Sequence, residues 1–306
     1  MAGSDAPIVV LDSGLGGLTV VQSIHRALPY EQIVYFGDTA RLPYGSKTAK
    51  VVTQFVRQII EYLLPLAPKH VVIACNTASA LALPAVRELF PELEITGVVE
   101  PGAKAAITAA PGAAPVIGVI ATEATVRSRA YVLAIQRHRP SAKVICRATP
   151  LLVPIIEEGR TAADPLVRMC LEQYLRPVLD QRPCALVLGC THYPILRDLI
   201  SQIVGDQVAV IDSADQSAQD VRLRLGSAGK LRHAEMDLAE MLRPAALPPL
   251  ELSPHPWLRC YVTDDSPRFA TLASRFLGIA VRQPEVVLPD LLYANMNIAA
   301  ASASPF

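Results

Sequence analysis

The sequence lacks an excess of charge of either sign. Its 306 residues include 28 lysines and arginines and 28 aspartates and glutamates, and no basic tract interrupts this balance. Proteins that bind nucleic acid usually present a cluster of basic residues to the phosphate backbone. We therefore expect no nucleic-acid partner. Apolar residues make up 51% of the chain, which is enough for a folded core and does not indicate disorder.

Long hydrophobic segments are also missing. A helix that spans a membrane needs about 18 or more apolar residues in a row. The longest candidate, residues 105–121, is interrupted by Pro111, Gly112 and Pro115. Residues 1–7 do not show the basic and apolar regions of a secretory signal. We therefore expect a cytoplasmic protein with no membrane partner.

Motifs for common cofactors are missing as well. The six cysteines show no paired spacing, and the segment from Cys190 to His192 does not have the ligand spacing of a zinc site. The glycine-rich residues 12–17 lack the third glycine of a dinucleotide fingerprint, because Thr19 occupies its position, and no P-loop lysine follows. No lysine lies beside these motifs at a strand end to bind pyridoxal phosphate. We expect neither a metal nor an organic cofactor, and we interpret the glycines as room for a small anion at a helix start.

Short apolar, β-branched runs alternate with helical patterns along the chain. Most of these runs are apolar on both faces, as in parallel strands that helices cover on each side. The expected strands begin near Ile8, Ile33, His70, Ile95, Pro115, Lys143, Ala185, Val208 and Leu258, and clear helical patterns span 49–64, 80–89, 125–137 and 164–179. This alternation predicts an α/β protein with mostly parallel sheets.

The chain also shows weak internal similarity, since a strand followed by a cysteine and small polar residues occurs in each half. Residues 97–102 fit a crossover between the halves. We expect a helix over 213–242, then a proline-rich extended linker over 243–257. The strand near Cys260 should return to one of the sheets. The final residues, 299–306, are small and polar and should fray.

Two cysteines each stand directly after an apolar strand. The segments are Cys75-Asn76-Thr77 and Cys190-Thr191-His192. Ligands of parallel sheets bind at the carboxyl ends of the strands. Two thiols on opposite sides of one carbon atom could take a proton from one face and return a proton to the other, which suits a racemase. The alternative is a pair of core cysteines, but the polar groups that follow them would be costly in a core.

Several polar residues could assist the thiols. An unperturbed thiol has a pKa of about 8.5, so a cysteine base needs help to ionise near neutral pH. Asp12, at the end of the first expected strand, and His192 are candidates, one for each cysteine. Their structural alternatives are a helix N-cap for Asp12 and a satisfied core histidine for His192. The segment 38–46 is either an ordinary turn or a carboxylate cradle formed by the Tyr44 hydroxyl and the backbone near Gly45.

Seven ordered motifs resemble those of bacterial glutamate racemases, in the cofactor-independent aspartate/glutamate racemase superfamily. They span residues 12–17, 38–45, 74–79, 97–102, 121–128, 152–159 and 188–194. The likeness extends to about Gly278. The resemblance implies interconversion of L- and D-glutamate without a cofactor, which would supply D-glutamate for peptidoglycan and so serve cell wall biogenesis and cell shape.

The resemblance also implies roles for individual residues. Cys75 and Cys190 correspond to the two acid/base residues, and Asp12, Glu157 and His192 would assist them. The residues implied to hold the carboxylates and ammonium of glutamate are Ser13, Tyr44, Gly45, Asn76, Thr77, Thr122 and Thr191.

The same resemblance implies an architecture. We expect two pseudo-symmetric α/β domains, residues 1–98 with 212–306 and residues 99–211, with the active site in the cleft between them. We also expect a homodimer. The chain departs from the family pattern at Thr149, where a cysteine is expected, and it has two adjacent acidic residues at 157 and 158, of which we prefer the first.

Two other functions remain open from the sequence. One is aspartate racemisation in the same superfamily, because a difference of one methylene is typically worth only about 1–3 kcal/mol of discrimination. The other is a non-catalytic protein that binds an amino acid on the same scaffold, against which the pair of cysteines argues.

Overall fold

The structure is a computed structural model that describes residues 3–232, 256–265, 268–281 and 284–292. Its described residues form two parallel sheets, one of six strands and one of four. In spatial order the first sheet contains β10 (Glu285–Val286), β9 (Leu258–Val262), β2 (Ile33–Gly37), β1 (Ile8–Asp12), β3 (His70–Ile73) and β4 (Ile95–Gly97). The second contains β6 (Lys143–Ala148), β5 (Val116–Ala121), β7 (Ala185–Gly189) and β8 (Ala209–Asp212). The predicted α/β class with mostly parallel sheets is confirmed.

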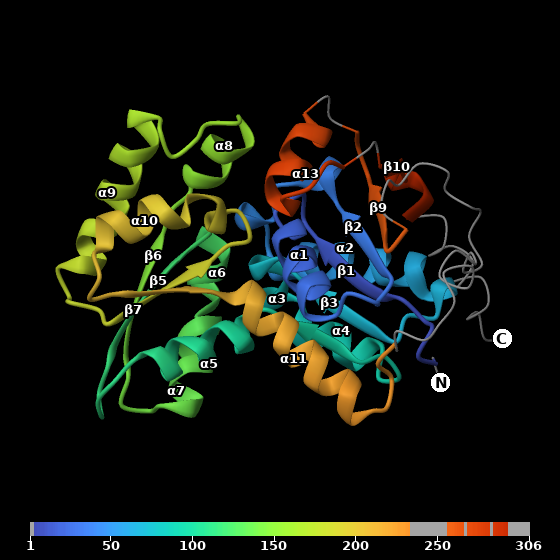
Figure 1. The fold of residues 1–306 in the computed structure, drawn as a ribbon, viewed down its shortest axis with the longest axis horizontal. Coiled ribbons are helices and arrows are strands. Elements are labelled where there is room, and N and C mark those ends of the chain that lie inside the picture. The colour runs from blue at the N-terminus through green and yellow to red at the C-terminus, as the bar shows by residue number, and fades with distance from the viewer. Residues whose placement is uncertain (1–2, 233–255, 266–267, 282–283, 293–306) are drawn as a thin grey trace.

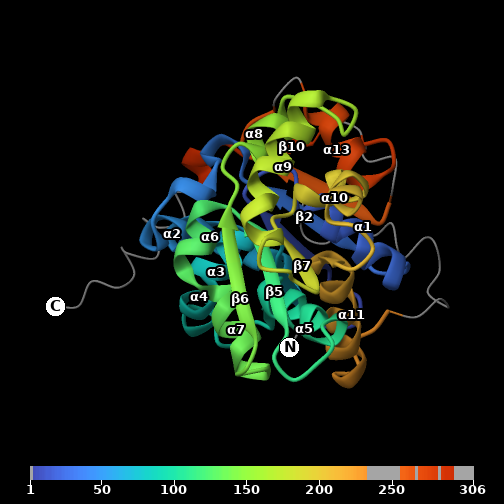
Figure 2. The ribbon, with the colours of Figure 1, turned by 90° about the vertical axis from the view of Figure 1, so that its left-hand side faces the viewer.

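Helices cover both faces of each sheet, and each sheet with its helices is called a lobe below (Figure 1). The first lobe has α1 (Leu18–Ala27), α2 (Ala49–Leu63), α3 (Asn76–Leu81), α4 (Leu83–Leu89) and α13 (Phe269–Leu277). The second has α5 (Val99–Ala109), α6 (Glu123–Ser128), α7 (Ala130–His138), α8 (Leu152–Glu157), α9 (Pro165–Leu179) and α10 (Arg197–Val204). Figure 2 shows α9 and α10 on one side of the second sheet and α5 and α7 on the other.

Helix α11 (Ser213–Ser227) joins the lobes, because it contacts α1 of the first and α5 of the second. It crosses their junction diagonally in Figure 1. Strand β9 contains Cys260 and pairs with β2, so the chain returns to the first sheet after α11. The domain boundaries 1–98 with 212–306 and 99–211 stay a prediction.

The central strands are buried along their whole length. All residues of β1, β2, β3 and β7 are buried, so both faces of each strand must be apolar. Complete burial of a Val, Leu or Ile side chain stabilises the fold by about 1.5–3 kcal/mol. One hydrophobic cluster contains Val10 and Leu18 of the first lobe together with Leu186 and Leu199 of the second. The lobes therefore share part of their core.

Two expected helices are each divided in two. The pattern over 80–89 is split between α3 and α4, and Pro84 lies in the first turn of α4. Proline lacks the N–H that would continue the preceding helix. The pattern over 125–137 is split between α6 and α7 at Arg129, whose φ of 57° lies in the left-handed region. A residue in that conformation ends a right-handed helix.

The helix expected over 213–242 is wrong in its length. Helix α11 ends at Ser227, and Gly229 follows with a φ of 64°, in the left-handed region. Residues 233–242 of the expected helix lie outside the described residues. The expected linker over 243–257 lies mostly outside the described residues, and the tail at 299–306 lies entirely outside them.

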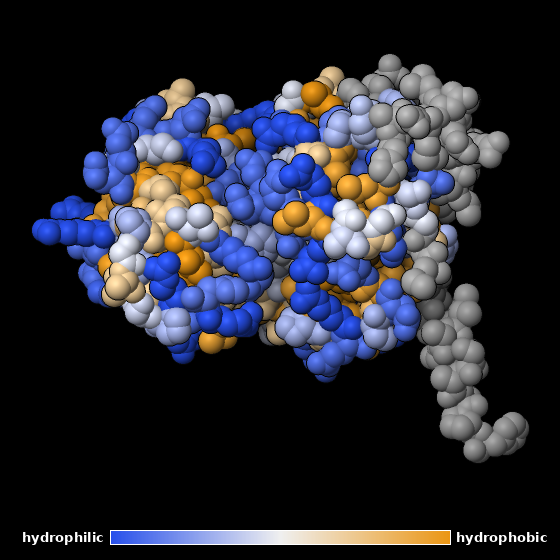
Figure 3. Space-filling view, turned by 60° about the horizontal axis from the view of Figure 1, so that its bottom comes forward, coloured by the Kyte–Doolittle hydropathy of each residue, from blue (hydrophilic) through white to orange (hydrophobic). Residues whose placement is uncertain are grey.

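The surface carries a mixture of polar and apolar side chains. Figure 3 shows the face at the bottom of Figure 1, where polar side chains surround apolar areas on both lobes. None of the helices in the described parts of the chain is long and apolar enough to cross a membrane.

A buried ion pair holds the start of the first sheet to the segment after α11. Lys69 Nζ lies 2.5 Å from Glu31 Oε2, and both side chains are almost fully buried. The same ammonium donates to the carbonyl oxygens of Ser4 and Lys230, and the backbone N–H of Arg232 donates to Glu31. The ion pair thus ties together segments that are far apart in the sequence.

Replacement of Lys69 by methionine should lower the free energy of unfolding by about 3–5 kcal/mol, because Glu31 would keep a buried charge without its cation. Urea unfolding followed by circular dichroism measures this loss. Arg57→Met is the matched control, since it removes the partner of Glu61 at the surface and should cost about 1 kcal/mol or less. Equal effects of the two substitutions would contradict the prediction.

Candidate active site

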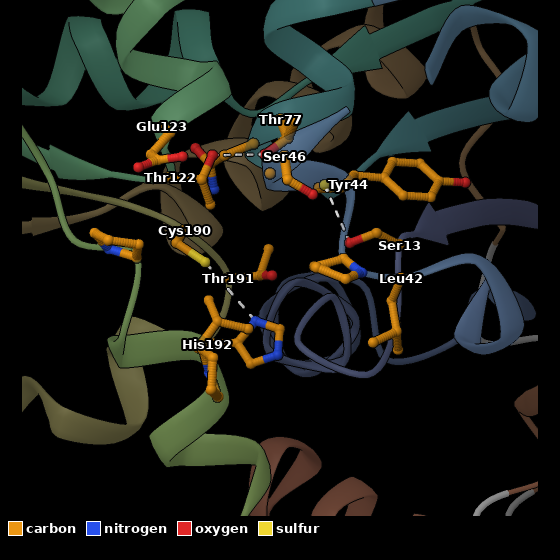
Figure 4. A pocket seen from close by; sticks show the side chains of 18 of the residues that line it. Ser13, Leu42, Tyr44, Ser46, Thr77, Thr122, Glu123, Cys190, Thr191 and His192 are labelled. Carbon is orange, nitrogen blue, oxygen red and sulfur yellow. Dashed lines mark hydrogen bonds between the residues drawn. The ribbon is translucent and has the colours of Figure 1, made fainter. Parts of the chain in front are cut away.

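A cavity of about 250 Å³ lies where the carboxyl ends of strands from the two sheets face each other. All the residues that we singled out, except Asp12, line it. They are Ser13, Tyr44, Gly45, Cys75, Asn76, Thr77, Thr122, Glu157, Cys190, Thr191 and His192. Figure 4 shows Cys190, Thr191 and His192 on one side of the cavity, with Ser13 and Leu42 across from them.

Cys75 approaches the cavity from the first lobe. It follows β3 and caps α3, where its sulfur accepts a hydrogen bond from the backbone N–H of Ala78 at 3.5 Å. Its thiol donates to the hydroxyl of Ser13 at 3.4 Å. Burial, and then the negative charge of Asp12, raise the pKa of Cys75 to about 12. Cys75 is therefore a protonated thiol at neutral pH.

Cys190 approaches the cavity from the second lobe with a different set of partners. Its sulfur lies 3.8 Å from Nδ1 of His192, and Nε2 of His192 lies 3.0 Å from Oε1 of Glu157. Burial alone would lower the pKa of His192, but the hydrogen bonds to Cys190 and Glu157 outweigh burial and raise the pKa to about 10. At neutral pH His192 is thus an imidazolium that donates from both ring nitrogens. A cation in this position stabilises a thiolate at Cys190.

Glu157 and Glu158, adjacent in the sequence, lie in different surroundings. Glu157 is partly buried against His192, whereas Glu158 is exposed and lies near Arg160. Of the two acidic residues, Glu157 is the one that reaches the cavity.

Asp12 lies behind the cavity rather than in its wall. Its Oδ2 accepts the backbone N–H of Gly14 at 3.0 Å, and the side chain is almost fully buried. Burial raises the pKa of Asp12, although the charge of His192 opposes this shift. The N-cap alternative does not hold for α1, which begins at Leu18 with Gly17 as its cap. The charge of Asp12 raises the pKa of Cys75, and its role as an assisting residue stays a prediction.

The Tyr44 hydroxyl is hydrogen-bonded outside the cavity, and its expected use in a carboxylate cradle stays a prediction. This hydroxyl donates to Asp38, whose carboxylate also accepts hydrogen bonds from Arg41 and Thr263. Figure 4 shows the ring of Tyr44 pointing away from the cavity. The hydroxyl belongs to this buried network, while Tyr44 and Gly45 both line the cavity. Neither Asp38 nor Thr263 has a signal in the sequence that links it to Tyr44.

Gly45 brings that backbone close to the second lobe. A Cβ atom at this position would lie 2.9 Å from the Cβ of Thr122, which is closer than side chains tolerate. Glycine therefore lets the 44–46 turn and Thr122 form one wall.

Three threonine hydroxyls form a hydrogen-bonded group across the lobes. Thr77 Oγ1 lies 2.8 Å from Thr122 Oγ1, and Thr125 Oγ1 lies within hydrogen-bond distance of both. Thr125 was not singled out from the sequence, although its place three residues after Thr122 fits the first turn of a capped helix.

Two further contacts tie the lobes at this site. Tyr131 donates to Oδ1 of Asn76 at 2.6 Å, and no sequence signal marked Tyr131. Gly16, before α1, lies against Thr191 and His192, and a Cβ on it would be 2.6 Å from Nδ1 of His192. Among the described residues, no three or more His, Cys, Asp or Glu side chains are grouped to hold a metal ion.

The two thiols should differ in their reaction with iodoacetamide. The thiolate is the reactive form, so Cys190, beside the His192 cation, should be alkylated at least about tenfold faster than Cys75 at pH 7. The two cysteines are each 6% exposed and line the same cavity, so their access is matched. The rate at Cys75 should rise with pH, because its thiolate fraction grows until the pH approaches about 12. Mass spectrometry of the peptides gives both rates.

The control for this experiment is His192→Asn, which should remove most of the difference between the two rates, since it removes the cation beside Cys190. Preferential alkylation of Cys75 in the unaltered protein would contradict the assignment of the charges.

Comparison with known proteins agrees with the geometry. Residues 8–221 match the family described as Asp/Glu/hydantoin racemase. The glutamate racemase of Chlorobaculum tepidum is 39% identical over 284 residues, which cover 93% of this chain and 97% of that protein. The structure of a glutamate racemase isoform from Bacillus anthracis superposes with a TM-score of 0.81 at 35% identity, covering 94% of this chain and 99% of that one. That of the glutamate racemase from Francisella tularensis in complex with D-glutamate gives 0.79 at 33% identity, covering 93% and 98%. The chain belongs to the Asp/Glu/hydantoin racemase family.

Proposed function

We propose that this protein interconverts L-glutamate and D-glutamate without a cofactor. The observation that carries the proposal is that two thiols, Cys75 and Cys190, line one cavity from opposite lobes. The relatives named above are glutamate racemases, and one of them is described with D-glutamate bound.

The proposed mechanism uses one cysteine as base and the other as acid. The thiolate of one cysteine takes the α-proton of glutamate and becomes a thiol. The thiol of the other delivers its proton to the opposite face of the α-carbon and becomes a thiolate. The pair ends with its charge on the other sulfur, so the reverse reaction uses the same groups in exchanged roles. The His192 imidazolium and Glu157 favour a starting state with the thiolate at Cys190 and the proton on Cys75.

Removal of the α-proton leaves negative charge that the cavity must stabilise without an electron sink. Ser13, Asn76 and Thr77 of the first lobe supply hydroxyl and amide groups to the wall, and Thr122 and Thr191 of the second supply further hydroxyls. Fixed dipoles in a site with little water stabilise developing charge more strongly than the same groups do in water. We propose that these side chains, with the backbone of the 44–46 turn, hold the carboxylates and the ammonium of the substrate.

We extend the proposal to the biological role. D-Glutamate is a component of peptidoglycan, so the proposed reaction would serve cell wall biogenesis and cell shape. The cytoplasmic location and the homodimer remain predictions from the sequence and from the family resemblance.

The first prediction from this proposal concerns exchange of the α-proton. Purified protein incubated with L-glutamate in D₂O, with no cofactor, should remove the α-proton signal in proton NMR while the optical rotation decays. Exchange with aspartate but not with glutamate would move the protein to aspartate racemisation. Binding of glutamate without any exchange would favour a non-catalytic binding protein.

The second prediction concerns the two cysteines. Cys75→Ser and Cys190→Ser should each lower kcat about 100- to 10,000-fold, since each removes an acid/base group. Cys170→Ser is the matched control, because Cys170 is equally buried but lies in α9, outside the cavity. Its activity should stay close to that of the unaltered protein. Turnover near normal in either active-site variant would refute the two-thiol mechanism.

A further inference from the structure

Only one of the two polar atoms in the Asn76 side chain has a hydrogen-bond partner among the described residues. It lines the cavity and is 2% exposed. Its Oδ1 accepts the hydroxyl of Tyr131 at 2.6 Å, whereas its Nδ2 has no hydrogen-bond partner among the described residues. A buried amide N–H without a partner is costly, and its presence beside a cavity calls for an acceptor from whatever occupies that cavity.

Tyr131 is closely packed where it meets Asn76. It belongs to α7 of the second lobe, whereas Asn76 begins α3 of the first. A Cβ on Gly102 would lie 3.2 Å from the Tyr131 hydroxyl oxygen, and one on Gly189 would lie 3.2 Å from the Cε2 atom of the ring. The absence of side chains at these two glycines therefore makes the slot that the tyrosine fills. Gly189, which forms part of this slot, directly precedes Cys190 in the sequence.

The hydrogen bond from Tyr131 also fixes which way the Asn76 amide faces. The phenol is buried, burial raises its pKa, and the group keeps its proton. The Tyr131 hydroxyl donates its proton, so it must contact the amide oxygen Oδ1 of Asn76 and not the nitrogen. Because the amide is planar, Nδ2 then points away from Tyr131. Asn76 is one of the residues that line the cavity, and its Nδ2 is buried in the wall.

We infer that Tyr131 is a positioning residue for the substrate: it holds the Asn76 amide so that Nδ2 donates to a carboxylate oxygen of the amino acid. Carboxylates are strong acceptors, and both enantiomers of the proposed substrate carry them. The inference rests on the proposed racemase function, but it concerns a residue of the second lobe that does not touch the cavity itself.

The test is Tyr131→Phe, which removes the hydroxyl and keeps the ring in its slot. Without the donor the amide is free to rotate, so kcat/KM should fall about tenfold with L-glutamate and with D-glutamate alike. Tyr261→Phe is the matched control, because Tyr261 is equally buried but belongs to β9 and does not line the cavity. It should leave kcat/KM within about twofold of the unaltered protein.

A double-mutant cycle separates positioning from a general effect on the fold. Because Tyr131 acts through Asn76, the change Tyr131→Phe should cost less than about twofold in a protein that already carries Asn76→Ala. A loss of about tenfold in both backgrounds would show that Tyr131 does not act through the amide and would overturn the inference. No loss in the unaltered background would overturn it as well.

A binding measurement keeps this inference distinct from the proposed function. If the unaltered protein binds glutamate in a calorimeter but does not racemise it, the proposed reaction fails. Tyr131→Phe should then still raise the dissociation constant about tenfold, and an unchanged constant would overturn the positioning role. Absence of glutamate binding to the unaltered protein would overturn both.

Discussion

Exclusion of water from the two sulfur atoms is the constraint on which this site depends. Burial in the cavity makes any charge expensive, and it holds Cys75 in the thiol form. Of the two sulfurs, that of Cys190 lies beside the His192 cation, whose pKa is raised against the same burial by its hydrogen bonds to Cys190 and Glu157. Two residues of one chemical type, in one cavity, therefore have different electrostatic surroundings. A reaction that must take one proton and give another requires such a difference.

In these parallel sheets, short segments at the carboxyl ends of two strands are enough to place both cysteines and their polar neighbours at the cavity. Each cysteine stands within two residues of the end of a central strand, and each is followed directly by the polar side chains that serve it. The same short segments also connect the lobes, through Thr77 with Thr122 and through Asn76 with Tyr131. The groups proposed to hold the substrate and the groups that join the lobes are therefore the same groups or their neighbours. The contacts that hold the two lobes together therefore also hold the side chains of the site in place.

The sequence predicted the strands and the two cysteines because both depend on local pattern. A fully buried strand needs apolar residues on both faces, and the thiols follow such strands directly. The lengths of α3, α6 and α11 were less predictable, since Pro84, Arg129 and Gly229 interrupt patterns that otherwise continue. The orientation of the Tyr44 hydroxyl and the contact of Tyr131 could not be predicted. Both depend on partners, Asp38 and Asn76, that reach them only through folding.

Gly16 gives this design a mechanical consequence. The start of α1 rests against Thr191 and His192 at a spacing that only a hydrogen atom fits, so the backbone of the first lobe supports the imidazolium of the second. A hinge motion that opens the cavity would withdraw this support from the ring that charges Cys190. The same motion of the lobes would then control both the entry of the substrate and the support of the His192 ring beside Cys190. The motion that opens the cavity would also weaken the activation of Cys190. When water can reach this sulfur, the sulfur has therefore lost part of its activation.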